Sequence, residues 1–169
     1  MSATAGFHFL DRAYLPRLVA AAELAAELDA RSDVTYQDVI DGGHELPGDT
    51  LRAVGREVAG DYGWSGYCMV HLLTYLDDQG VDLFASEYGA ECDVINASYS
   101  LTVLMTPAHK VFLPQLDPAA RGDRELHRHF ETMAYGFAEA ATAARDGLEI
   151  LRDGIAALEE HEILVLHVG

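Results

Sequence analysis

Cys68 and His71 lie three residues apart in an apolar stretch that also holds Tyr67 and Tyr75. A cysteine beside a histidine can supply a thiolate nucleophile. On a helix these side chains would lie near one face and could line the pocket of a small enzyme or a small-molecule-binding protein. The surrounding residues are apolar, and burial raises the pKa of a thiol. The simpler interpretation is therefore a packed, unreactive cysteine beside a hydrogen-bonded histidine.

A second group of residues combines carboxylates with tyrosines. Glu87, Glu91 and Asp93 are close in the sequence, with Tyr88 among them. Carboxylates can serve in acid–base chemistry or bind a cation, but this spacing does not match a calcium-binding loop. Tyrosine beside carboxylates also suits a surface that binds arginine-rich proteins, whereas the plainer alternative is a solvated acidic rim. The binding interpretation adds Tyr62 to this surface. It requires three exposed tyrosines: Tyr62, Tyr88 and Tyr99.

The histidines of the last third suggest metal chemistry only weakly. His127 and Glu131 are four residues apart, so on a helix they would share a face, as two ligands of one ion do. His129 would point roughly the other way. The sequence contains no HExxH or CxxC motif, no GxGxxG and no phosphate-binding P-loop. We therefore predict no metal site and no cofactor.

Charge restricts the partners of this chain. Asp and Glu number 28 against 11 Lys and Arg, which gives a formal net charge of −17. Nucleic acids and anionic membranes are bound by basic patches, so we predict neither as a partner. A basic protein would be attracted, and its association would be accelerated. The scarcity of lysine among the cations indicates coding bias in a GC-rich bacterial genome.

Length and composition favour one folded domain. The chain has 169 residues, of which 50% are hydrophobic, which argues against disorder. Two cysteines are too few for a disulfide scaffold. No signal-peptide pattern opens the sequence, and its apolar runs are far shorter than the ~18 residues that suggest a membrane span. We therefore predict a single cytoplasmic domain over residues 1–169.

The elements that must position these residues are strands near both ends of the chain and helices between them. Residues rich in β-branched and aromatic types predict strands in four segments: 6–10, 99–105, 110–113 and 162–168. The first and last of these could pair. Helical patterns occupy three segments before Gly80: 14–30, 50–59 and 66–79. Residues 34–40 fit either a short strand or one helical turn, and 81–97 have no clear pattern.

The last third carries small or apolar residues at alternating spacings of three and four, from His127 to Leu158. One helix over 124–160 would be roughly 55 Å long. A compact domain of this size has a radius of gyration of only ~15 Å. The segment must therefore project, break, or pack against a partner. A break near Gly147 would give two antiparallel helices. The 127–158 face could otherwise form a homodimer, or pack within the chain against 14–30.

Together these patterns predict an α+β fold. It is mostly helical, with a small, mainly antiparallel sheet that includes both chain ends and with a long C-terminal helix or helical hairpin. The function that we predict is an acidic protein-binding module, immunity-like or regulatory, acting on a basic partner. The alternative is a small-molecule-binding protein or small enzyme that uses the Tyr67–Tyr75 region.

Overall fold

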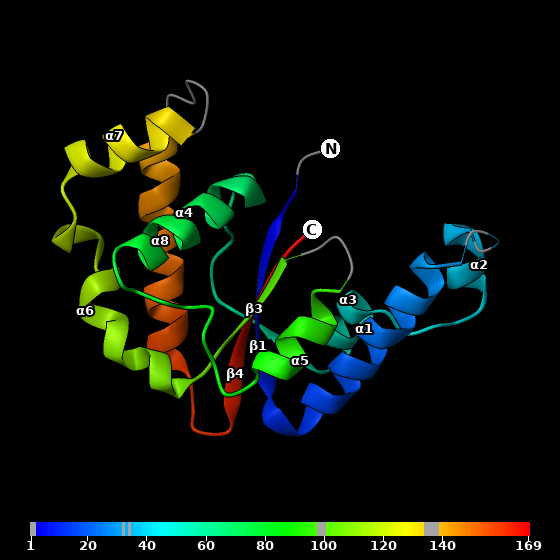
Figure 1. Ribbon diagram of the computed structural model, residues 1–169. Helices are drawn as coiled ribbons and strands as arrows, with labels where there is room; N and C mark the ends of the chain where they lie inside the picture. Colours follow the sequence, from blue (N-terminus) through cyan, green and yellow to red (C-terminus); the bar gives the residue numbers. More distant parts are fainter. Residues whose placement is uncertain (1–2, 32, 34, 98–100, 134–138) are drawn as a thin grey trace.

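The computed structural model describes residues 3–31, 33, 35–97, 101–133 and 139–169. An antiparallel sheet of four strands, in the order β2-β1-β4-β3, forms its centre (Figure 1). The strands are β1 (Ala5–Asp11), β2 (Arg56–Glu57), β3 (Leu101–Met105) and β4 (Glu162–Val168). The first and last strands pair over their whole length, from Ala5 opposite Val168 to Asp11 opposite Glu162. The α+β fold and the sheet that includes both chain ends are therefore confirmed.

Both faces of the sheet are covered, which is why β4 is apolar at almost every position. Side chains alternate along each strand. Phe7, Phe9 and Leu166 belong to the larger apolar cluster, whereas Leu10 and Val165 belong to a smaller one on the opposite face. The two clusters are the cores of the two helical layers.

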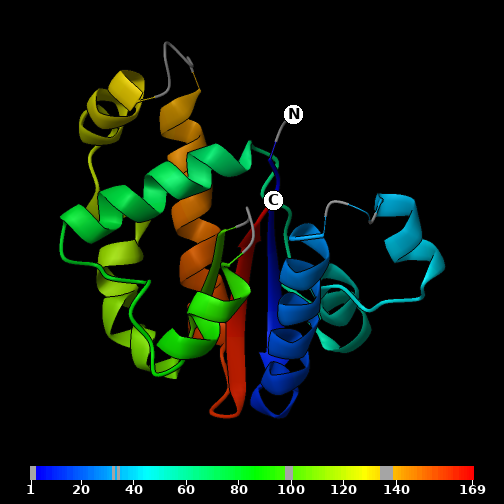
Figure 2. The same ribbon diagram turned by 45° about the vertical axis from the view of Figure 1, so that its right-hand side comes forward.

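Helices pack on either side of this sheet (Figures 1 and 2). The larger cluster lies under α4 (Gly66–Asp78), α6 (Leu113–Leu116), α7 (Asp123–Met133) and α8 (Ala140–Ala157). The smaller cluster lies under α1 (Leu15–Asp29), α3 (Pro47–Val54) and α5 (Gly89–Ile95). The short helix α2 (Tyr36–Asp41) follows α1 and lies away from the sheet. Among the described residues, no helix is both long enough and apolar enough to span a bilayer.

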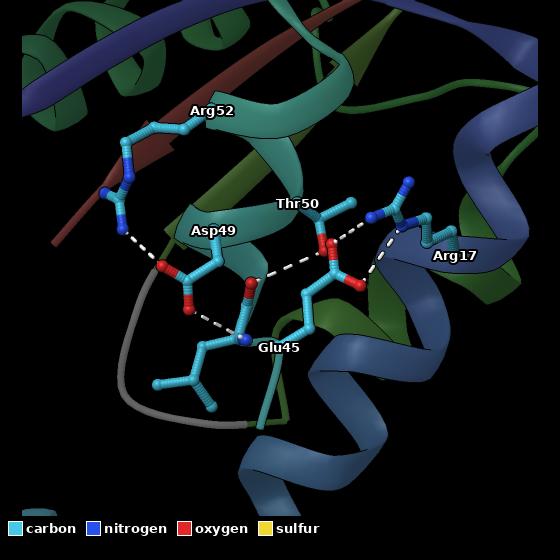
Figure 3. Close-up of polar contacts among 6 residues, drawn as sticks. Arg17, Glu45, Asp49, Thr50 and Arg52 are labelled. Atoms are coloured by element: carbon cyan, nitrogen blue, oxygen red, sulfur yellow. Dashed lines mark hydrogen bonds and ion pairs between the residues drawn. The ribbon is translucent and has the colours of Figure 1, made fainter. Parts of the chain in front are cut away.

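Side chains fix where several helices begin. Ser65 accepts a hydrogen bond from the Tyr67 amide and starts α4, and Gly80, at φ +79°, follows its end. At α3, Asp49 accepts from the Leu46 amide at 3.1 Å and also contacts Arg52 (Figure 3). Beside it, an exposed ion pair between Arg17 and Glu45 joins α1 to the segment before α3 (Figure 3). These contacts fix the start of α3 and join it to α1.

The predicted strand at 110–113 is wrong. Residues Pro107–Phe112 form a 3-10 helix, η2, which leads directly into α6. Proline suits the first turn of a helix, and His109 Nδ1 accepts the Thr106 amide at 3.0 Å, so a local bond replaces strand pairing. Lys110 donates to the Leu158 carbonyl at the end of α8, at 2.6 Å.

Other early elements differ in detail from their patterns. Residues 36–41 are helical, and residues 89–95, which had no clear pattern, form α5. The helix predicted over 50–59 ends at Val54, because Arg56 and Glu57 pair with β1 as the edge strand β2.

The heptad segment consists of two helices, as one alternative predicted, but the break is not at Gly147. The first, α7, ends at Met133 and the second, α8, begins at Ala140, and residues 134–138 fall outside the described ranges. Gly147 is inside α8, where an added Cβ would lie 2.5 Å from Leu72 Cδ2 of α4. The glycine therefore permits close packing of α8 on α4 and does not end a helix.

Much of the heptad face is buried within the chain. Leu148, Leu151 and Ile155 have no exposed surface, and α8 packs against α4, α6 and α7. The expected packing against the 14–30 helix is wrong, because α1 covers the opposite face of the sheet. These positions are thus already covered without a second copy. Homodimerisation through 127–158 stays a prediction without support from this arrangement.

Candidate functional site

The residues around Cys68 do not face one cavity. Tyr67 is 60% exposed, whereas Tyr75, on the same helix, is 3% exposed. The Tyr75 hydroxyl donates to Glu125 and accepts from Arg121 at 3.0 Å, which ties α4 to the α7 region. Cys68 is half-buried, and burial raises the pKa of its thiol. His71 is half-buried on the same helix. The arrangement favours a structural role for this group over nucleophilic chemistry.

Tyr62 is not an exposed binding residue, contrary to the prediction. It is 8% exposed, and its hydroxyl donates to the Ala143 carbonyl of α8 at 3.1 Å. Burial raises the pKa of this phenol far above its ordinary value. Tyr62 therefore helps to hold α8 in place. Tyr99 lies outside the described residues, so its exposure stays a prediction.

The other predicted binding residues come together beside α1. Two adjoining hollows, of about 380 and 760 Å³, lie along α1 and α5 and share Glu23 as a lining residue. We call them the α1–α5 groove (Figure 2 shows the two helices). Its acidic residues are Glu23, Glu27, Glu91 and Asp93. Its small and apolar residues include Val19, Ala20, Ala26, Ala30, Val94 and Ala97.

Helical spacing explains why these side chains line one groove. On α1, Glu23 and Glu27 are four residues apart and therefore lie on one side. On α5, Ile95 is buried in the smaller cluster, and Cys92 packs against that cluster with its Sγ 3.2 Å from the Thr102 carbonyl. Glu91 and Asp93, on either side of Cys92, are left toward solvent. Among the described residues, none of the four groove carboxylates takes part in an ion pair.

One end of the groove already holds an arginine. Arg12, in the 3-10 helix η1 (Arg12–Tyr14), pairs with Glu87 at 3.6 Å. Its guanidinium carbon also lies 5.9 Å from the centre of the Tyr88 ring. Tyr88 is half-buried and Glu87 is exposed. Carboxylate and aromatic ring thus combine here in the way the sequence predicted for arginine binding, although the arginine belongs to this chain.

A polar cluster on the sheet was missed by sequence reasoning. His8 of β1 and His167 of β4 lie on neighbouring strands and on the face under α1, α3 and α5. Burial lowers the pKa of both imidazoles, and the pKa of His167 is lowered further by His8. The charge of Glu57 raises the pKa of His8, whereas that of Arg52 lowers it. The available signal was that each histidine alternates with apolar residues in its strand.

Thr102 links this cluster to α5. Its hydroxyl lies 2.9 Å from His167 Nδ1, and Asn96 bonds both its amide and its carbonyl, at 2.6 and 2.8 Å. Burial raises the pKa of the Cys92 thiol nearby. These bonds fasten α5 to the edge strand β3, so they hold one wall of the groove in place.

No protein-family model, curated protein or solved structure matches this chain. Within the described ranges, no three His, Cys, Asp or Glu side chains gather closely enough to hold a metal ion. His127 is exposed and lies with Arg124 and Arg145 in a separate hollow between α7 and α8. The α1–α5 groove is therefore the site whose chemistry is most specific, because it combines a concave apolar surface with four carboxylates.

Proposed function

We propose that this protein is a binding module that takes up a basic segment of a partner protein in the α1–α5 groove. The observation that carries the proposal is the composition of the groove, where small apolar side chains lie between carboxylates of two helices. Apolar surface favours burial by a partner, and the carboxylates select a partner of opposite charge.

The charge of the whole chain supports the same partner class. At a net charge of −17, the field of the protein attracts a basic surface before contact and raises the rate of association. The four groove carboxylates have no ion-pair partner among the described residues, so they are available to cations from outside. Such a module would act as an immunity-like or regulatory protein, by covering the basic surface of its partner.

A direct test uses a fluorescent arginine-rich peptide of about 14 residues, which is long enough to follow α1 along the groove. Its binding to the natural chain is compared with binding to a groove variant in which Glu23, Glu27, Glu91 and Asp93 become Gln, Gln, Gln and Asn. A control variant changes four exposed carboxylates of the same total charge at other places: Asp77, Asp78, Glu149 and Glu160.

We expect the groove variant to bind at least about tenfold more weakly than the control variant. Binding to the natural chain should also fall steeply at about 0.5 M salt, because the charges are exposed to solvent. Equal loss in both variants would mean that net charge alone attracts the peptide. That result, or binding that salt does not affect, contradicts the proposal.

A further inference from the structure

We infer that the segment bound in the α1–α5 groove is an amphipathic α-helix that carries arginines four residues apart. This inference rests on the proposed function and adds to it the conformation and the side-chain pattern of the partner. It follows from five features of the groove: its walls, its length, the spacing of its carboxylates, the size of its floor residues and the arginine that it already holds.

The walls of the groove are helices, which favours a helical ligand. In α1 and α5 the main-chain groups are bonded within each helix, so the groove offers no strand edge. A segment bound as a strand would lay amide and carbonyl groups on an apolar floor without partners, which is costly. A helix satisfies these groups internally and presents only side chains.

The length and spacing of the groove also fit a helix. Along α1 the lining runs from Pro16 to Ala30, which is about 21 Å at ~1.5 Å per residue. A ligand helix of about four turns covers that length. Glu23 and Glu27 are one turn apart, a rise of about 6 Å, and arginines four residues apart on a parallel or antiparallel helix have the same spacing.

The floor is formed largely of small side chains, which allows a helix to approach closely. Ala26 and Ala30, at the end of α1, line one hollow together with Ala97 beyond the end of α5, and Ala20 of α1 lines the other hollow. Packed helices come within ~8 Å of each other where the contact residues are small. The apolar stripe of the ligand would rest on these alanines, and its flanking arginines would reach Glu23 and Glu27 on one wall and Glu91 on the other.

Arginine is favoured over lysine by what the groove already holds. Arg12 lies between Glu87 and the ring of Tyr88 at one end of the groove. A planar guanidinium stacks on an aromatic ring and bonds a carboxylate at the same time, and a lysine ammonium does this less well. The other carboxylates of the groove therefore offer the arginines of a partner the same kind of contact that Glu87 makes with Arg12.

The test compares two labelled peptides of about 14 residues. The first has arginines at i and i+4 in each half and alanine or leucine on one face. The second is identical except that one central alanine is a proline, which breaks a helix but keeps the charge. Affinity is measured by fluorescence anisotropy, and the helicity of the bound peptide by circular dichroism.

We expect the helical peptide to bind at least about tenfold more tightly than the proline peptide, and to gain helicity on binding. Replacing Ala20 by Leu should weaken binding of the helical peptide about tenfold, because it raises the floor without changing charge. The matched control is A156L, at an exposed alanine of α8 on the other side of the sheet, which should bind like the natural chain.

The outcomes separate this inference from the proposed function. Equal affinity for both peptides, with both lost in the groove variant E23Q/E27Q/E91Q/D93N, overturns the helical ligand and leaves the basic partner supported. If the groove variant binds both peptides as well as the control variant does, the proposed function fails and the inference fails with it. Tighter helical binding that A20L leaves unchanged also overturns the inference, since the ligand would then lie elsewhere.

Discussion

The two faces of the sheet are covered in different ways. On the face under α4 and α8, chemically capable residues are used in packing: Tyr62 bonds α8, and Tyr75 bonds Glu125. On the face under α1 and α5, the helices leave an open groove, and its four carboxylates have no ion-pair partner among the described residues. The candidate residues on the first face therefore serve packing, and the open face is the candidate for binding.

The largest effect on stability is expected at Gly147, on the packed face under α4 and α8. A side chain there would enter the contact between α8 and α4, since even a Cβ would lie 2.5 Å from Leu72 Cδ2. We expect Gly147→Val to lower the free energy of unfolding by about 2–3 kcal/mol, measured by urea denaturation.

Ala156→Val is the control for Gly147→Val, because Ala156 is exposed on the same helix. It should cost only about 0.5 kcal/mol, from the lower helix propensity of valine. A G147V protein as stable as A156V would mean that α8 does not pack closely on α4.

A second, smaller effect concerns Tyr62. Replacing it by Phe removes the hydroxyl that donates to Ala143 but keeps the buried ring. We expect a loss of about 1 kcal/mol in the free energy of unfolding. Binding of an arginine-rich peptide should not change. Tyr67→Phe, at a tyrosine that is 60% exposed, is the control and should change neither quantity. Weaker peptide binding by Y62F would restore Tyr62 as a binding residue.

Mild acid should act on two histidines of the sheet face under α1, α3 and α5. The pKa values of His8 and His167 are lowered by burial from the ordinary value of 6.5. The unfolded chain therefore binds protons more readily, so these groups contribute stability above about pH 6.5 that is lost as the pH falls toward the lowered values. The charged groups that act on His8 are Glu57 and Arg52, and His8 in turn lowers the pKa of His167.

Urea denaturation at about pH 7.5 and about pH 5.5 tests this linkage. We expect the free energy of unfolding to fall between these values in the natural chain and to fall less in H8N/H167N. H161N, at an exposed histidine near Glu159, is the matched control substitution. The same slope in H8N/H167N and in the natural chain would remove the two strand histidines as its cause.

The strands at the chain ends were predictable because their signal is local. Phe7 and Phe9 alternate with His8, and residues 162–168 are nearly all apolar. The strand predicted at 110–113 failed because apolar residues there serve a helical segment whose start depends on His109 bonding Thr106. Similarly, Gly147 was expected to break a helix, since nothing local shows that Leu72 lies against it.

The candidate site was predictable only in part. Glu91, Asp93 and Tyr88 stood out because carboxylates and tyrosine cluster in the sequence. Glu23 and Glu27 did not, because their spacing on an alanine-rich helix is that of any solvated helix face. Only the contact of α1 with α5, far apart in the chain, makes one groove of these residues. Tyr62 was misassigned since its burial depends on α8, about eighty residues later.

The smallest expected effect is on the free energy of unfolding of the groove variant, and it tests whether the groove carboxylates stabilise the fold. Glu23 and Glu27 are like charges one turn apart, and Glu91 lines the same hollow as Glu23. Like-charged pairs at this spacing destabilise a helix by about 0.2–0.5 kcal/mol. Neutralising the groove in E23Q/E27Q/E91Q/D93N should therefore raise the free energy of unfolding slightly, while it weakens peptide binding at least about tenfold.

Glu45 is the control, because it pairs at 2.8 Å with Arg17 of α1, the helix that carries Glu23 and Glu27. E45Q should lower the free energy of unfolding slightly, the opposite sign, and leave peptide binding intact. A groove variant that loses more than about 1 kcal/mol would show that its carboxylates hold the fold together. Residues that serve only the fold do not make the protein more stable when they are replaced. A groove variant that gains stability and loses peptide binding would therefore mark the groove as a surface selected for a partner, at a cost to the stability of the free chain.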